Sequence, residues 1–182
     1  MFDPTAFENI KTVVEGYIYD KDLEGNLEIL DRNDLFNSSK LSKEYTITVA
    51  LKQQENAKIS LSLLADIKNL AAELIDDYGK DISIGATIKL HLYMRHANRN
   101  DICRTIDSLL KELWGNEVSI VQEISYNPLL SDNIVTNHTI INFNRLITEE
   151  QLDDLLTMID FVEFTLEKLS SMSSLLRLKG DG

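Results

Sequence analysis

The stretch ISIGATIKLHLYMRHANRNDICRTIDSLLKELWG, residues 82–115, contains two different hydrophobic periods. Every second residue is apolar in its first part, and apolar residues recur three or four positions apart in its second part: these are Ile82, Ile84, Ala86, Ile88, Leu90, Leu92 and Met94, then Ile102, Ile106, Leu109, Leu110 and Leu113. The first period is typical of a half-buried strand and the second of an amphipathic helix. The stretch therefore predicts a strand from Ile82 to Met94, followed by a helix from about Asp101 to Trp114 that ends at Gly115.

The residues before this stretch predict a short helix, three strands and a long helix. Asp3 and Pro4 are a typical helix start, and Phe7, Ile10 and Val14 follow at helical spacing. The next segments are predicted as a hairpin of strands 14–19 and 27–30 turning at Gly25 and Asn26, a mobile loop over 31–43, a strand over 45–51, and a helix over 63–78 that ends at Gly79.

The residues after Gly115 predict two strands and a C-terminal helix. The strands are expected over 118–126 and 134–143, paired antiparallel. Thr148 and Gln151 have the spacing of a capping box, so a long helix is predicted over 148–176, and Ile147 and Leu152 can form a hydrophobic staple around its start. This order predicts a single α+β domain, residues 1–182, in which two or three long helices cover mainly one face of a mixed, mostly antiparallel sheet of about six strands.

The composition indicates a folded, acidic protein. Of its 182 residues 43% are hydrophobic, and 30 acidic residues against 18 basic ones give a net charge of −12. This charge disfavours nucleic acid and anionic membranes as partners and favours a basic or neutral protein surface. The chain has no apolar run long enough for a membrane span and no visible secretion signal, and its single cysteine suits a reducing compartment, so a cytoplasmic location is expected.

One acidic segment has the spacing of a calcium-binding loop. Asp20, Asp22, Glu24 and Asp31 fall on ligand positions of an EF-hand loop, and Gly25 falls on its turn position. Glu24 and Asp31 are not the customary residues at their positions, and the residues before the loop favour a strand. Two interpretations remain, a solvated hairpin turn and a site for a divalent cation.

The softer metal ligands and the thiol do not form a strong motif. His91 and His96 are five residues apart, and on a strand they would point to opposite faces, so no zinc site is expected. Cys103 beside Arg104 could be activated at a helix start, but no histidine is placed next to it. The glycines are isolated, which excludes a phosphate-binding loop, and no cofactor is expected.

Positive charge gathers at the turn between the central strand and helix. From Lys89 to Lys111 five bases accompany only two acids, whereas residues 112–176 contain eleven acids and two bases. Arg95, Arg99 and Arg104 could bind a phosphate or carboxylate near the helix start. The alternative is that these arginines are solvated and pair with the acidic C-terminal helix.

The order of strand, turn, helix and strand over 84–126 resembles the phage-type Holliday junction resolvases, whose metal-binding helix begins with D-x-D-N-x-x-K-x-x-x-D and is followed by glycine. Asp101 and Gly115 match the first aspartate and the glycine, whereas Cys103, Arg104, Asp107 and Lys111 occupy the positions of the second aspartate, the asparagine, the lysine and the last aspartate. The resemblance implies a degenerate nuclease-like domain that lacks carboxylates needed for two-metal cleavage.

The apolar stripe of the C-terminal helix is wider than a helix on one sheet needs. Met158, Phe161 and Phe164 extend it and are candidate contacts for a protein partner or a second copy of the chain, unless the helix lies between two layers of its own domain. The leading hypothesis is a non-enzymatic acidic interaction protein: an adaptor, inhibitor or regulatory subunit. The alternative is a phosphate- or nucleic-acid-binding domain that acts through the three arginines.

Overall fold

Six strands form one open sheet in the computed structural model of the protein, which describes residues 5–54, 56–74 and 84–172. The strands are β1 (Leu27–Asn37), β2 (Ser42–Leu51), β3 (Ala57–Ala65), β4 (Ala86–Ala97), β5 (Ser119–Ser125) and β6 (Ile134–Ile147). Their order across the sheet is β1-β2-β3-β4-β6-β5, and every neighbouring pair is antiparallel. The predicted α+β class is confirmed, with a sheet that is entirely antiparallel.

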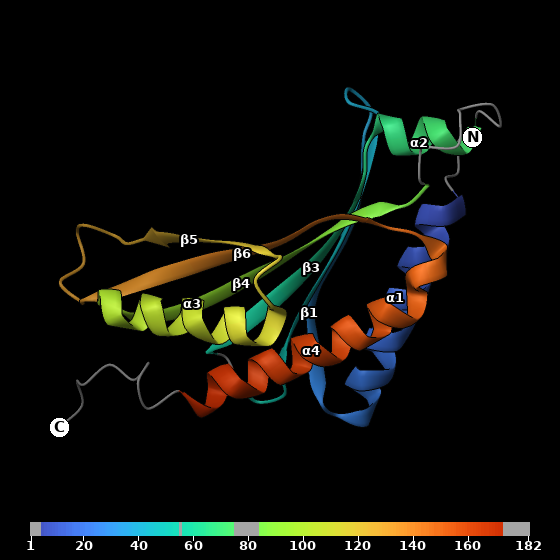
Figure 1. Cartoon of the computed structure of the whole chain (residues 1–182). Helices are drawn as coiled ribbons and strands as arrows, with labels where there is room; N and C mark the ends of the chain where they lie inside the picture. Colours follow the sequence, from blue (N-terminus) through green and yellow to red (C-terminus); the bar gives the residue numbers. More distant parts are fainter. Residues whose placement is uncertain (1–4, 55, 75–83, 173–182) are drawn as a thin grey trace.

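Three long helices lie on one side of this sheet (Figure 1). They are α1 (Thr5–Glu24), α3 (Asn100–Trp114) and α4 (Leu152–Ser171), while the short α2 (Ile67–Leu74) lies beyond the end of β3. A 3-10 turn, Glu149–Gln151, precedes α4. None of the described helices is both long and apolar enough to cross a membrane.

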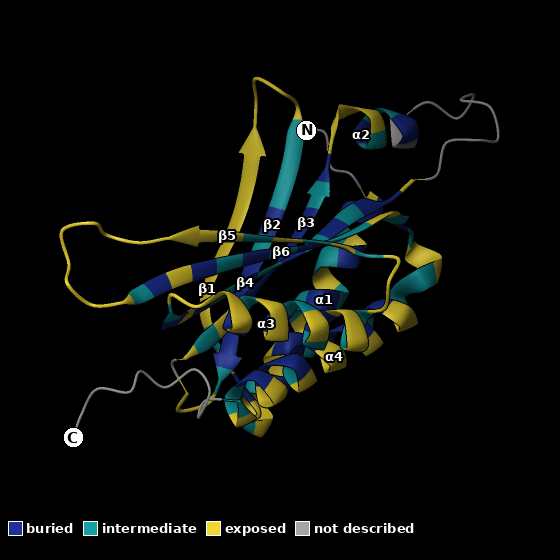
Figure 2. Cartoon of the chain, turned by 60° about the vertical axis from the view of Figure 1, so that its left-hand side comes forward, coloured by how far each residue is buried: buried dark blue, intermediate teal, exposed yellow. Residues whose placement is uncertain are grey.

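Burial alternates from residue to residue along the central strands (Figure 2). In β4 the side chains at even positions, from Ala86 to His96, are buried against the helices, and those at odd positions are half-buried or exposed. We call the face that carries the even-numbered side chains of β4 the helix-covered face. The face that carries the odd-numbered side chains, among them His91 and Tyr93, is the open face. The alternation predicted for this strand is therefore confirmed from Ala86 onward, while Ile82 lies outside the described residues.

The start of β4 depends on a glycine. A Cβ atom at Gly85 would lie 2.0 Å from the carbonyl oxygen of Ile147, the last residue of the neighbouring strand β6. No side chain fits in that space, so the two backbones approach only because this residue is glycine.

The predicted hairpin between residues 14 and 30 is wrong, because α1 continues to Glu24; of its two strands only 27–30 is confirmed, as the start of β1. The buried α1 residues Phe7, Ile10, Val14, Ile18 and Lys21 keep helical spacing throughout. Gly25, with a φ of 85°, then ends the helix and leads directly into β1. Asp3 and Pro4, the predicted helix start, lie outside the described residues.

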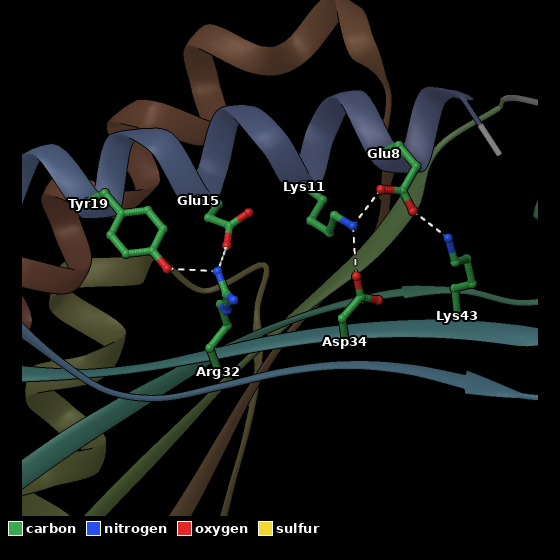
Figure 3. A network of polar contacts seen from close by, with 7 residues as sticks. All are labelled: Glu8, Lys11, Glu15, Tyr19, Arg32, Asp34 and Lys43. Carbon is green, nitrogen blue, oxygen red and sulfur yellow. Dashed lines mark hydrogen bonds and ion pairs between the residues drawn. The ribbon is translucent and has the colours of Figure 1, made fainter. Parts of the chain in front are cut away.

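The predicted mobile loop over 31–43 is also wrong, because these residues form most of the β1–β2 hairpin. In the outer part of β1, Arg32 and Asp34 point toward α1 and pair with charged residues of that helix (Figure 3). Lys11 Nζ lies 2.7 Å from Asp34 Oδ2, and Arg32 pairs with Glu15 and donates to the Tyr19 hydroxyl at 2.8 Å. A polar sequence therefore forms a regular strand here.

The predicted helix over 63–78 is wrong in its first part. Leu63 and Leu64 belong to β3, where Ile59, Leu61 and Leu63 alternate with Ser60 and Ser62. The chain changes to helix at Asp66, whose Oδ1 accepts hydrogen bonds from the amides of Lys68 and Asn69 at 2.9 and 3.0 Å. Tyr78 and Gly79 lie outside the described residues.

The C-terminal predictions are confirmed where the structure describes them. β5 and β6 pair antiparallel, and Thr148 and Gln151 form the capping box, in which the Thr148 amide donates to Gln151 Oε1 at 3.2 Å. The predicted end of the helix, residue 176, lies outside the described residues.

Candidate functional site

A groove with a volume of about 450 Å³ lies where the end of α3, the end of β6 and the first half of α4 meet. We call it the aromatic groove; its lining residues are Leu113, Trp114, Glu117, Val118, Phe143, Arg145, Asp154, Thr157, Met158 and Phe161. It combines apolar side chains in its interior with charged side chains from three different segments.

Three aromatic rings form the apolar wall of the aromatic groove. The Trp114 ring lies 5.5 Å from the Phe143 ring, edge to face, and 5.8 Å from the Phe161 ring, measured between centroids. Trp114 Nε1 donates to Thr165 Oγ1 at 3.2 Å, and Thr165 in turn donates to the carbonyl oxygen of Phe161 at 2.6 Å. The indole therefore has a fixed orientation relative to α4.

The predicted partner-binding residues of α4 lie in different environments. Met158 is buried and forms part of the groove and of the core, whereas Phe161 and Phe164 are 41% and 40% exposed. Phe164 does not line the groove; Lys168 Nζ lies 5.0 Å from the centre of its ring. The wide apolar stripe of α4 therefore packs into the core at Met158, whereas its two phenylalanines are partly exposed at the surface.

The segments that form the aromatic groove are rich in acidic residues. Between residues 112 and 172 the chain has eleven acidic residues and two basic ones, Arg145 and Lys168. Glu117 and Asp154 line the groove together with Arg145. The rim therefore has a net negative charge when these three side chains are ionised.

Two further acids of α4 face α1. Lys21 Nζ lies 2.8 Å from Asp160 Oδ1 and 2.5 Å from Glu163 Oε2, and the Tyr17 hydroxyl donates to Asp160 at 2.8 Å. Burial of Lys21 disfavours its charged form, but the hydrogen bonds to Asp160 and Glu163 outweigh this and raise its pKa. For Asp160, burial likewise opposes ionisation, and the hydrogen bonds from Lys21 and Tyr17 lower its pKa in spite of it.

The predicted anion-binding arginines do not meet at one place. Arg95 lies on the open face of β4, in a hollow of about 550 Å³ with Lys58 and Tyr93. Arg99 precedes α3 and donates from Nε to Asp101 Oδ1 at 3.0 Å, with a second contact from Nη2; this hydrogen bonding lowers the pKa of Asp101. Arg104 lines another hollow, on the helix-covered side.

The cysteine beside Arg104 is half-buried in α3. Burial raises the pKa of the Cys103 thiol. A raised pKa favours the protonated thiol, which is a poorer nucleophile than the thiolate.

The predicted cation-binding residues are separated by secondary structure. Asp20, Asp22 and Glu24 lie in the last turns of α1, where residues two apart point to opposite sides of the helix. Asp31 lies in β1 and accepts a hydrogen bond from Asn33 at 2.8 Å. Within the part of the chain that the structure describes, no three His, Cys, Asp or Glu side chains gather around a point where a metal ion could bind.

His96 and His91 point to opposite faces of β4, as predicted. His96 is fully buried on the helix-covered face, where its Nδ1 donates to the carbonyl oxygen of Ala97 at 2.7 Å and its Nε2 accepts from Asn137 at 3.1 Å. Asn137 also donates to Gln122, whose amide donates to the carbonyl oxygen of Cys103 in α3, both at 2.8 Å. His96 is thus part of a hydrogen-bonded network between the sheet and α3.

The structure brings His91 together with His138, which is 47 residues away in the sequence. Nδ1 of His91 and Nε2 of His138 are 3.0 Å apart on the open face. Burial lowers the pKa of His91, and electrostatic repulsion from the neighbouring His138 and Lys89 adds to this effect. No local spacing in the sequence indicates the pair, because it depends on the register of β4 and β6.

Comparisons with protein-family models, with curated protein sequences and with solved structures gave no match to this chain.

Proposed function

We propose that this protein is a non-enzymatic interaction protein, an adaptor, inhibitor or regulatory subunit, that binds a basic segment of a partner protein in the aromatic groove. The observation that carries the proposal is the 41% exposed ring of Phe161 beside Trp114 in a hollow of about 450 Å³. Aromatic side chains in such hollows are typical anchors of protein interfaces.

The charge around the groove determines the kind of partner. Glu117 and Asp154 line it together with a single base, Arg145, so its charged lining is negative overall. Complementary charge accelerates association, while an apolar side chain inserted between the rings supplies most of the affinity. We therefore expect a partner segment that has one or two apolar side chains flanked by Lys or Arg. We place this interaction in the cytoplasm, since a single half-buried thiol suits a reducing compartment.

Trp114 provides a direct assay, because it is the only tryptophan of the chain and lies in the groove. We expect its emission to shift to shorter wavelength, in a saturable way, when the protein is titrated with an amphipathic Leu/Lys helical peptide. The control is a Leu/Glu peptide with the same apolar spacing, which the acidic rim should repel. Binding of the Leu/Lys peptide should weaken as the salt concentration rises.

Two phenylalanine variants test the location of binding. Phe161→Ser should weaken binding of the Leu/Lys peptide about 10-fold or more, because it removes one wall of the groove. Phe36→Ser is the matched control: Phe36 is also exposed, but it lies in the β1–β2 hairpin. Equal affinities of the wild type and Phe161→Ser, or equal binding of the two peptides, would contradict the proposal.

A second copy of the chain is the competing occupant of the groove. Size-exclusion chromatography with light scattering distinguishes the two cases. A monomer supports the proposal, whereas a dimer that Phe161→Ser dissociates and Phe36→Ser does not would assign the groove to self-association.

A further inference from the structure

The open face of the sheet carries three ionisable side chains in a row, on the side opposite the aromatic groove's helices. Glu123 lies on β5, His138 on β6 and His91 on β4. Nδ1 of His138 lies 3.3 Å from Glu123 Oε2, and Nε2 of His138 lies 3.0 Å from Nδ1 of His91. The row therefore links three neighbouring strands through one imidazole in the middle.

The carboxylate determines which nitrogen of His138 carries hydrogen. An ionised carboxylate accepts hydrogen bonds but cannot donate them, so Glu123 at 3.3 Å from Nδ1 favours the neutral His138 tautomer that has its hydrogen on Nδ1 and its lone pair on Nε2. Nδ1 of His91 then donates to that lone pair. One hydrogen atom, on Nδ1 of His91, thus lies between the two rings, and Nε2 of His138 accepts it. Glu123, at the other nitrogen of His138, favours this acceptor role.

Stacking fixes the orientation of the central ring. The Tyr93 ring lies 4.5 Å from the His138 ring at an angle of 6°, and the two residues are direct partners in the register of β4 and β6. The His91 ring lies 5.2 Å from the His138 ring at 21°. Both imidazoles are therefore oriented by their neighbours.

We propose that His91 and His138 form a two-histidine site for a divalent transition metal ion, Zn²⁺ or Ni²⁺, and that Glu123 orients His138 for this role. Two imidazole nitrogens on one tetrahedral Zn²⁺ are about 3.3 Å apart, because each Zn–N bond is about 2.0–2.1 Å long. The 3.0 Å between Nδ1 of His91 and Nε2 of His138 has to widen by a few tenths of an ångström, and both rings have to turn, because the two nitrogens now face each other in a hydrogen bond and must face the ion instead.

The proton balance of this binding is simple. When the ion binds Nδ1 of His91, the hydrogen atom on Nδ1 leaves to solvent and Nε2 takes one up, so His91 remains neutral. His138 keeps its hydrogen on Nδ1, on the side of the ring that faces Glu123. The described helices α1, α3 and α4 lie on the other face, so water or a donor from another molecule can occupy the remaining coordination positions (Figure 1).

Calorimetric titration of the untagged protein with ZnCl₂ and NiCl₂ tests the site. We expect saturable binding of one ion per chain, and no such binding of MgCl₂, because imidazole ligands suit Zn²⁺ and Ni²⁺ but not Mg²⁺. His91→Asn and His138→Asn should each abolish it. Both side chains are partly exposed, and circular dichroism checks that each variant is folded.

The role of Glu123 is tested with a matched pair of acid variants. Glu123→Gln should weaken Zn²⁺ binding about 10-fold, because the amide orients His138 less strongly. Glu112→Gln removes the same charge from an exposed position of α3 and should leave the affinity unchanged. Unchanged binding in His91→Asn, equal losses in the two acid variants, or equal binding of Mg²⁺ would overturn the proposal. Phe161→Ser should bind Zn²⁺ like the wild type, which keeps this test separate from that of the groove.

Discussion

Single residues determine how closely the segments of this fold approach each other. Alanine substitutions at two glycines should change the free energy of unfolding in opposite directions for this reason. A Cβ atom at Gly85 would lie 2.0 Å from the carbonyl oxygen of Ile147, whereas a Cβ atom at Gly16, in the middle of α1, has nothing within 4 Å. Gly85→Ala should lower the free energy of unfolding by about 2 kcal/mol or more, because backbone must move. Gly16→Ala should raise it by about 0.5–1 kcal/mol, because alanine favours helix.

Urea denaturation of the two alanine variants measures both effects on one scale. The prediction depends on the opposite signs rather than on the sizes of the changes. If Gly85→Ala were as stable as the wild type, the close approach of β4 and β6 at this residue would not exist.

At the scale of elements, local signals were reliable where one face is apolar. The strand β4, the helix α3 and the start of α4 were predictable because their apolar periods or capping residues lie within the element itself. The strands predicted over 27–30 and 45–51 lie in β1 and β2, but the polar part of this hairpin was not predictable, because Arg32 and Asp34 are stabilised by Glu15 and Lys11 of α1, which no local pattern reveals (Figure 3).

The residues of the candidate sites were likewise predictable only where the signal lies within one element. Phe161 was predictable as a surplus apolar residue of α4, but the rings of Trp114 and Phe143 come from other elements. The pair His91 and His138 needed the register of β4 and β6, in which Tyr93 is opposite His138. Sequence periodicity gives the face of a residue but not its neighbour on the next strand.

The start of α4 allows a prediction about one element. Thr148 and Gln151 form its capping box, so Thr148→Ala should lower the free energy of unfolding by about 1 kcal/mol. Thr105→Ala is the control, since Thr105 is exposed within α3 and donates to the carbonyl oxygen of Asp101 at 2.8 Å. Alanine favours helix there, so a small gain in stability is expected. If both variants lost the same free energy of unfolding in thermal or urea denaturation, the capping box would not stabilise α4 more than a threonine inside a helix does.

At the scale of the whole molecule, the first and last helices are joined by a cluster of charges. Lys21 of α1 contacts Asp160 and Glu163 of α4, which are about 140 residues away in the sequence. The Lys21 side chain is 11% exposed, so its loss leaves Glu163, 16% exposed, without its cation. Lys21→Met should therefore lower the free energy of unfolding by about 1–3 kcal/mol at pH 7. Lys111→Met, in the exposed pair with Asp107, should change it by less than about 0.5 kcal/mol.

The pH dependence of this difference follows from the two pKa shifts. The folded protein lowers the pKa of Asp160 below 3.8, so the stabilisation by this carboxylate is present above that pH and is lost as the pH falls further. It raises the pKa of Lys21 above 10.5, so the stabilisation by the ammonium group is present below that pH and is lost as the pH rises further. The difference in the free energy of unfolding between the wild type and Lys21→Met, measured by urea denaturation, should therefore be greatest between pH 5 and pH 9 and should shrink toward pH 3. The difference between the wild type and the control Lys111→Met should change little over the same range. A difference that stayed constant from pH 7 to pH 3 would mean that Asp160 is not a charged partner of Lys21 and that another contact joins α1 to α4.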